Sequence, residues 1–194
     1  MGQLLNYSDI AKNVGVDTTT IQSWFLLLEE NGILCILQPY HSNFNQRLIK
    51  TPKIYFEDTS LAVRLQGWTE LNPMWMSPYF GSLLENLALS EVSRFFINNN
   101  DEAEIFFLRS KDQVEVDFLI RLPNERYIGA EVKSTPTEFT KQQLSLLDSL
   151  QINIVDRWVI TLIPADLPPC QVHEVRGVHL RCSGAHRRKR GRTS

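Results

Sequence analysis

Two segments of the chain carry its clearest structural pattern: Val114-Glu115-Val116-Asp117-Phe118-Leu119-Ile120 and Ile128-Gly129-Ala130-Glu131-Val132-Lys133. Apolar and polar residues largely alternate in both, which is typical of β-strands because successive side chains point to opposite faces. The residues Pro123-Asn124-Glu125 separate the two stretches and are typical of a turn. We therefore expect strands over residues 113–121 and 127–134 that pair as a hairpin.

The alternation assigns the side chains of this hairpin to two faces. One face is expected to be apolar and to enter the core: Val114, Val116, Phe118, Ile120, Ile128, Ala130 and Val132. The opposite face is expected to bring together Asp117, Glu131 and Lys133, with Glu115 and Leu119 beside them. Neighbouring strands lie about 4.8 Å apart, so two carboxylates on adjacent strands can both reach one metal ion at about 2.1 Å.

The side chains on this face predict the chemistry of the site. Carboxylate oxygens, with no His or Cys nearby in the sequence, favour Mg²⁺ or Mn²⁺ over zinc. Lys133 would lie beside the ion, where it can position or deprotonate a water molecule or neutralise charge on a phosphate. The alternative is a solvated hairpin face, because Glu–Lys pairs across strands are common on protein surfaces.

The rest of the chain predicts an α/β fold around the hairpin. Helical spacing of apolar residues predicts a long helix over residues 80–98 and a second helix over 137–150. Strand-like runs occupy residues 104–109 and 154–162, and a last strand is expected over 172–180. The order helix, three strands, helix, strand is that of an α/β sandwich.

The first part of the chain predicts a small helical module followed by a hairpin. Asn6 or Ser8 can cap a helix that ends at Gly15, and Asp17 or Thr18 can cap a second helix running to about Asn31. Strands are expected over residues 33–37 and 48–56. Two helices joined by a tight turn and followed by a hairpin have the layout of a winged helix-turn-helix.

Aromatic residues are expected to contribute to the core. The second helix carries Ile21, Trp24, Phe25 and Leu28 at positions i, i+3, i+4 and i+7, which predicts one apolar face. We expect a core role for Trp24 and for four phenylalanines further along the chain: Phe95, Phe96, Phe106 and Phe107.

Charge limits the partners that this chain can bind. The sequence of 194 residues has a net charge of −2, but residues 1–180 carry 14 basic against 22 acidic residues. An acidic body repels the phosphate backbone, and no Lys or Arg lies between Lys12 and Arg47. The helix-turn-helix is therefore expected to serve packing or protein contact more readily than DNA reading.

Composition also bears on the location of the protein. No apolar run approaches the roughly 20 residues that a membrane helix needs, and the N-terminus lacks a signal-peptide pattern. The three cysteines are widely spaced and odd in number, which indicates free thiols. We expect a cytoplasmic protein with no membrane partner, and the sequence assigns no oligomeric state.

The motifs together resemble a known nuclease superfamily. Asp117, a step of 14 residues to Glu131, and then Lys133, preceded by a helix that carries Glu85, resemble the PD-(D/E)xK nucleases. Residues 53–62, 81–86, 115–118 and 131–134 are also similar to the C-terminal domain of unknown function that follows an AAA-type ATPase domain in many prokaryotic proteins. The resemblance covers roughly residues 4–163.

This resemblance implies a domain organisation. It implies a winged-helix module over residues 1–60 and a restriction-endonuclease-like α/β/α domain over residues 61–180. Residues 181–194 are expected to form a basic, disordered tail. The chain contains no G-x-x-x-x-G-K-S/T motif, so no ATP site is assigned to it.

The resemblance also implies roles for individual residues. Asp117 and Glu131 would hold Mg²⁺ or Mn²⁺, joined by the carbonyl group of Val132, while Lys133 would serve the water or the transition state. Glu85 would assist them, and Gln143 would line the site. The implied function is a magnesium-dependent phosphodiesterase acting on DNA. The alternative is an inactive interaction or sensing module that serves an ATPase domain.

Overall fold

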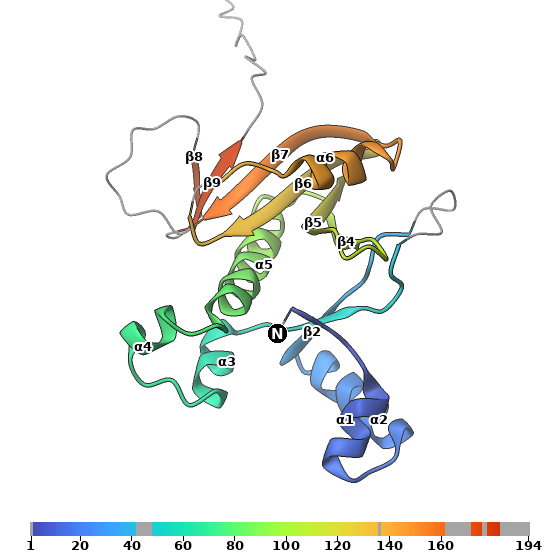
Figure 1. The fold of residues 1–194 in the computed structure, drawn as a ribbon, viewed down its shortest axis with the longest axis vertical. Coiled ribbons are helices and arrows are strands. Elements are labelled where there is room, and N and C mark those ends of the chain that lie inside the picture. The colour runs from blue at the N-terminus through green and yellow to red at the C-terminus, as the bar shows by residue number, and fades with distance from the viewer. Residues whose placement is uncertain (1, 42–47, 136, 162–171, 176–177, 183–194) are drawn as a thin grey trace, which may run out of the picture.

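A computed structural model describes residues 2–41, 48–135, 137–161, 172–175 and 178–182 of the chain (Figure 1). These residues form a mixed α/β structure with a three-stranded sheet, a six-stranded sheet and helices. The elements in chain order are β1 (Gln3–Leu4), α1 (Tyr7–Val14), α2 (Thr18–Glu30), β2 (Leu34–Leu37), β3 (Lys53–Phe56), α3 (Thr59–Leu65), α4 (Leu71–Trp75), α5 (Phe80–Asn98), β4 (Glu104–Arg109), β5 (Glu115–Leu122), β6 (Arg126–Lys133), α6 (Lys141–Asp148), β7 (Asn153–Thr161), β8 (Val172–Val175) and β9 (Val178–Cys182).

The first two helices begin where the capping residues predict. The side chain of Asn6 accepts hydrogen bonds from the backbone N–H groups of Ser8 and Asp9, which opens α1. Gly15 ends α1 with a φ of 83°, a conformation that glycine adopts without strain. Asp17 then accepts a hydrogen bond from Thr20 N–H and caps α2.

The small sheet has the antiparallel order β1-β3-β2, and its central strand is shorter than predicted. The expected strand over 48–56 contracts to β3 because Pro52, which has no N–H to donate, stands just before it. Leu48 and Ile49 pair instead with the end of β4, where Ile49 N–H donates to the carbonyl of Arg109 at 2.8 Å.

The predicted core role of Trp24 is wrong. Trp24 is 47% exposed, and within α2 only Ile21 is buried. The physical reason is the small size of the module: α2 packs against α1 and β2, which together cover a single stripe of the helix. Of the four phenylalanines, Phe96 and Phe107 are buried, whereas Phe95 and Phe106 are half-buried.

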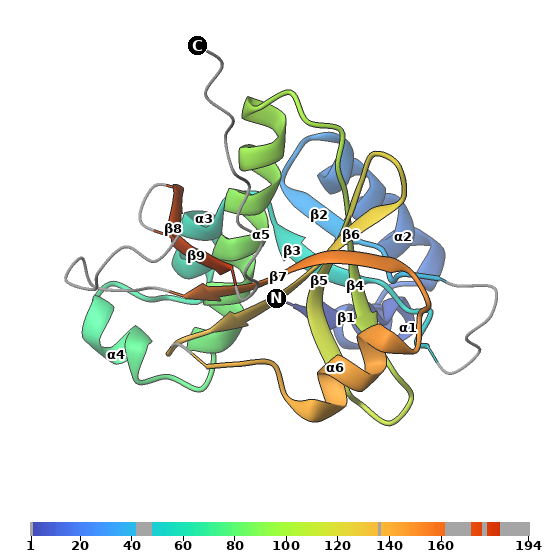
Figure 2. The same cartoon turned by 90° about the horizontal axis from the view of Figure 1, so that it is seen from above.

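The large sheet has the strand order β4-β5-β6-β7-β9-β8. The predicted hairpin is formed by β5 and β6, with Phe118 opposite Ala130. The pair β6–β7 is parallel and is connected through α6, as a parallel connection requires. Figures 1 and 2 show α5 on one face of this sheet and α6 on the other.

The end of the chain is described only in part. The expected last strand over 172–180 is present as two short strands, β8 and β9, which pair with each other. The predicted tail over residues 181–194 begins within β9, and residues 183–194 lie outside the described residues.

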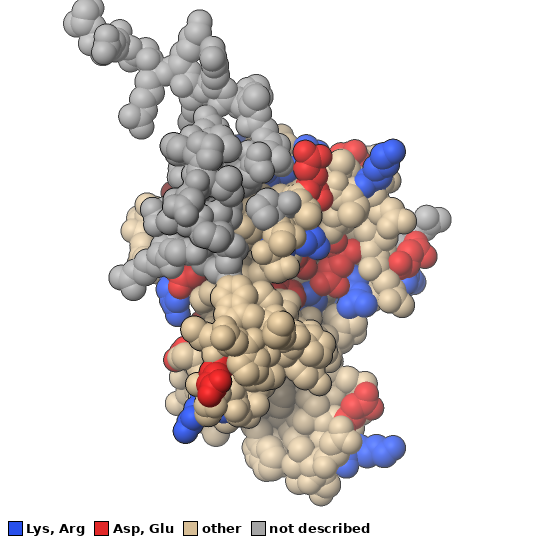
Figure 3. Space-filling view, turned by 60° about the vertical axis from the view of Figure 1, so that its left-hand side comes forward, with Lys and Arg blue, Asp and Glu red and all other residues tan. Residues whose placement is uncertain are grey.

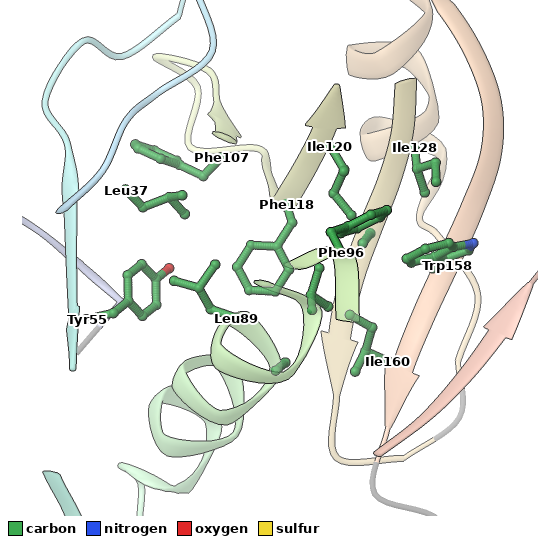
Figure 4. Close-up of a cluster of buried hydrophobic side chains, with 13 residues drawn as sticks. Leu37, Tyr55, Leu89, Phe96, Phe107, Phe118, Ile120, Ile128, Trp158 and Ile160 are labelled. Carbon is green, nitrogen blue, oxygen red and sulfur yellow. The ribbon is translucent and has the colours of Figure 1, made fainter. Parts of the chain in front are cut away.

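Each face of the large sheet packs into its own apolar cluster. The first cluster joins the sheet to α5 and to the small sheet, and Figure 4 shows Tyr55 and Leu37 facing Leu89, Phe118 and Phe107 there. The second cluster joins the sheet to α6 and contains, among others, Val116, Leu119, Leu147 and Val159. The first cluster consists of Leu37, Tyr55, Ala88, Leu89, Val92, Phe96, Phe107, Phe118, Ile120, Ile128, Ala130, Trp158 and Ile160.

A β-bulge in β5 changes the predicted face of Val116, whereas Phe118, Ile120, Ile128, Ala130 and Val132 share the first cluster as predicted. From Phe106 to Leu108 the strand β4 advances two residues, while β5 advances three, from Leu119 to Val116. The extra residue changes the alternation, so Val116 packs with Leu119 and not with Phe118. Helices cover both faces of the large sheet, so an apolar side chain such as that of Val116 would be buried on whichever face it occupied. Glu115 is thereby turned toward β3 and α5, where its carboxylate meets Lys53.

Candidate functional site

Four carboxylates and two lysines gather beside the bulge of β5. One carboxylate oxygen each from Glu85, Glu115 and Asp117 lies within 4.8 Å of the other two. The contributing elements are β3, α5, β5 and β6. The six residues are Lys53, Glu85, Glu115, Asp117, Glu131 and Lys133. This set is called the acidic cluster below.

Asp117 joins the two central strands through its side chain. Its Oδ2 accepts a hydrogen bond of 2.8 Å from the backbone N–H of Val132, which lies between Glu131 and Lys133. Burial, together with repulsion from Glu131 and Glu85, raises the pKa of Asp117 well above its ordinary value. Among the described residues no ion pair neutralises Asp117 directly, so this carboxyl group is the least compensated of the cluster.

Glu131 is buried and only partly satisfied. The residue is 3% exposed, and its Oε1 lies 2.6 Å from Nζ of Lys133. Its Oε2 is buried and has no hydrogen-bond partner in the part of the chain that the structure describes. A buried carboxylate oxygen without a partner costs free energy, and it is a ligand of the kind that a hard divalent cation prefers. The residues present therefore fit such a cation.

Lys133 is a cation at neutral pH. Burial tends to lower its pKa, but the contact with Glu131 and the charge of Asp117 raise it above the ordinary value. Its side chain is 40% exposed, so the ammonium group lies between the buried Glu131 and the solvent. Of the roles considered from the sequence, neutralising the charge of a bound anion fits an ammonium group better than accepting a proton.

Lys53 and Tyr55 enter the cluster from β3. Nζ of Lys53 lies 2.8 Å from Oε1 of Glu85 and also contacts Oε1 of Glu115. The hydroxyl of Tyr55 donates to the same oxygen of Glu85 at 2.5 Å. Burial and the charge of Glu85 raise the pKa of Tyr55, which keeps this hydroxyl neutral and able to donate.

Gln143 links α6 to the strand that carries Asp117. Its Oε1 accepts from the N–H of Thr140 and completes a capping box at the start of α6, while its Nε2 donates to the carbonyl of Glu115 at 2.9 Å. Burial raises the pKa of Glu131, and the contact with Lys133 opposes this rise. The structure thus places Gln143 between the helix cap, β5 and the acidic cluster.

The sequence motif and the structure overlap but are not identical. The structure brings Glu85, Asp117, Glu131 and Lys133 together, and Val132 contacts Asp117 through its N–H group. Sequence reasoning gave no role to Lys53, Tyr55 or Glu115. The sequence does contain a pattern that could have identified Lys53 and Tyr55. These two residues alternate with apolar Ile54 and Phe56 and so share one face of the strand.

The raised pKa of Asp117 predicts a pH-dependent stability in the absence of metal. A raised folded-state pKa stabilises the fold at low pH, and that contribution is lost as pH rises from about 4 through the folded-state value. Asp117→Asn keeps the acceptor for Val132 N–H but cannot ionise. We expect its Tm to exceed that of the wild type at pH 8 by roughly 2–4 °C for each kcal/mol relieved.

Thermal denaturation of both proteins in a chelator, at pH 5 and pH 8, checks this expectation. The difference in Tm between variant and wild type should grow from pH 5 to pH 8. A difference that stays constant across this range would show that Asp117 does not titrate differently in the folded and unfolded states.

The fold and the cluster define a mixed α/β protein with a partly buried acidic site beside its central hairpin. Residues 1–72 match the domain of unknown function DUF8612, and residues 80–175 match the domain of unknown function DUF4143. The chain is also similar to Uncharacterized protein Rv2008c of Mycobacterium tuberculosis and Uncharacterized protein Mb2031c of Mycobacterium bovis, at 28% identity over 159 residues in each case.

These relatives are much longer than the aligned region. The alignment covers 78% of this chain and 33% of each relative, so the chain spans about a third of the length of the curated relatives it matches. No solved structure matches the chain. None of the helices in the described ranges has both the length and the apolarity needed to cross a bilayer.

Proposed function

We propose that this chain carries a metal-dependent phosphodiesterase site of the PD-(D/E)xK type that acts on DNA. The observation that carries the proposal is the convergence of Asp117, Glu131 and Lys133 on one spot. Asp117 accepts from the N–H group between the other two residues, and the buried Oε2 of Glu131 lacks a partner among the described residues. A chance group of surface charges would be solvated and would leave no such buried oxygen.

Each residue of the site has a distinct role in this proposal. Asp117 and Glu131 would hold Mg²⁺ or Mn²⁺, and the Val132 carbonyl would join them. The bound cation would supply Lewis-acid polarisation of a phosphate oxygen. Lys133 neutralises charge that develops on the phosphate, and Glu85, which is held by Lys53 and Tyr55, contributes to the negative field that attracts the cation.

The same proposal interprets the two sheets. The order α1, α2, β2, β3 suits a winged helix-turn-helix, and helices on both faces of the large sheet suit a restriction-endonuclease-like α/β/α domain. In the longer relatives these parts would follow an AAA-type ATPase domain, and the protein would be cytoplasmic.

A cleavage assay tests the proposal. The full chain should cut single- or double-stranded DNA in the presence of Mg²⁺ or Mn²⁺, and excess chelator should stop the reaction. Asp117→Asn should remove this activity, whereas Asp112→Asn, a matched change at an exposed aspartate on the turn before β5, should leave it unchanged. Intact DNA of every form after prolonged incubation with either cation would contradict the proposal.

A second candidate function is a non-catalytic module that serves an ATPase domain. The observation that favours it is the exposed apolar surface of α2, on which Trp24, Leu26 and Leu27 are each about half exposed or more. Figure 3 shows that charged side chains gather in the upper half of that view, while the lower parts are mostly uncharged. Such surfaces mark protein contacts more often than DNA contacts.

Salt dependence separates the two candidates. DNA binding by this chain should weaken steeply with salt, because phosphate contacts release counterions. Absence of any DNA binding at low salt in a gel shift and in calorimetry would favour the second candidate.

A further inference from the structure

The acidic cluster contains the ammonium group of Lys53, a positive charge that is not part of the nuclease motif. The side chain of Lys53 is 1% exposed, and its Nζ contacts both Glu85 and Glu115. The same Nζ lies 5.3 Å from the centroid of the Phe107 ring, which adds a cation–π contact. A lysine is almost never buried to this degree unless it is paired, so this ammonium group is a fixed part of the cluster.

The carboxylate of Glu85 is enclosed by residues from the beginning of the chain. Tyr55 and Lys53 both donate to its Oε1. Gly2 lies against the other oxygen, since a Cβ atom at position 2 would stand only 2.7 Å from Oε2 of Glu85. Glu85 therefore has little freedom to turn toward a ligand elsewhere.

The positive charges are distributed unevenly over the four carboxylates. Glu85 and Glu115 share Lys53, and Oε2 of Glu115 also lies 3.2 Å from Nη1 of Arg109. Glu131 is paired with Lys133. Asp117 receives a single neutral N–H group from Val132 among the described residues. The need for a further cation is therefore concentrated between Asp117 and Glu131.

We propose that Lys53 is an internal cation that takes the place of a second metal ion between Glu85 and Glu115. It confines a divalent cation to the side of the cluster formed by Asp117 and Glu131. The spacing supports this, because oxygens of Glu85, Glu115 and Asp117 within 4.8 Å of one another could otherwise share one ion. The proposal deepens the proposed function and rests on it for the metal at Asp117 and Glu131.

The Lys53→Met variant tests this role. Methionine keeps most of the length of the side chain but removes the charge. Among the described residues, Arg109 is then the one ion-pair partner left to Glu85, Glu115 and Asp117. We expect the variant to have a lower Tm than the wild type in chelator. Mn²⁺ should restore most of that loss, and titration calorimetry should detect one more bound Mn²⁺ than in the wild type.

Two further variants make the result specific. Lys50→Met removes an exposed lysine three residues earlier and should change neither Tm nor Mn²⁺ binding. In Lys53→Met/Glu115→Gln one carboxylate is removed together with the ammonium group. This double variant should recover stability in chelator and lose the additional Mn²⁺.

The outcomes are separable from those of the proposed function. Equal Mn²⁺ stoichiometry and affinity in Lys53→Met and wild type would overturn the role of Lys53, and so would a variant that stays unfolded in Mn²⁺. A wild type that neither binds Mn²⁺ nor cleaves DNA would overturn the nuclease proposal alone, provided that Lys53→Met still gains a Mn²⁺ ion.

Discussion

Lys133→Met should lose at least about a hundredfold of its metal-dependent cleavage rate, which is the size of effect produced when one charge-stabilising donor is removed from an active site. Nζ of Lys133 lies 2.6 Å from Oε1 of Glu131 while 40% of its side chain is exposed, so under the proposed function it can contact both Glu131 and an incoming phosphate. The loss should appear in kcat rather than in KM, because the charge that it neutralises grows in the transition state.

Steady-state cleavage in Mg²⁺, measured together with Mn²⁺ calorimetry, checks this prediction. Lys133→Arg, which keeps the charge but changes its geometry, should recover part of the rate. Lys141→Met, at an exposed lysine of α6, is the matched control and should behave as the wild type. A Lys133→Met variant with an unchanged kcat would remove Lys133 from the mechanism.

The largest expected effect on stability belongs to Phe107→Ala. Phe107 is fully buried, and its ring lies beneath Nζ of Lys53. Its backbone forms hydrogen bonds with Gln38 and Tyr40, so Phe107 stands where the two sheets meet. Removal of a buried Phe side chain costs about 3–5 kcal/mol, which corresponds to a fall in Tm of roughly 6–20 °C for a chain of this size. The change also removes the aromatic face beneath the Lys53 ammonium.

The neighbouring residue supplies the control for this measurement. Phe106 is half-buried, and its ring contacts Tyr40 and Arg121 at the other side of β4. Phe106→Ala should therefore lower Tm by clearly less than Phe107→Ala in the same denaturation experiment. Equal losses would show that the junction of the two sheets is not a stability centre.

Local sequence patterns predicted most of the elements of this fold. Some patterns depend only on residues close together in the sequence and can be recognised from the sequence alone. These are the helix caps at Asn6, Gly15 and Asp17 and the apolar stripe of α5. Three short elements, β1, α3 and α4, were not predicted, because two, seven and five residues hold too little of a strand or helical period to be recognised.

The composition of the site was only partly readable. The paired strands predicted the meeting of Asp117, Glu131 and Lys133, since antiparallel register follows from a short turn. The bulge in β5 leaves no compositional trace, because Val116 is apolar and suits either covered face of the sheet. Lys53 and Glu85 are 32 residues apart, and their meeting depends on how the small sheet docks on α5.

The way β3 supplies Lys53 has a practical consequence for dissecting this protein. A fragment that begins after residue 60 would carry Glu85 and Glu115 without their ammonium partner or the Tyr55 hydroxyl. Such a fragment would hold two carboxylates of the same charge without a cation between them, and it would expose part of an aromatic core to water. If that fragment were inactive or precipitated, the result would follow from the choice of its boundary. It would not test the chemistry of the intact chain.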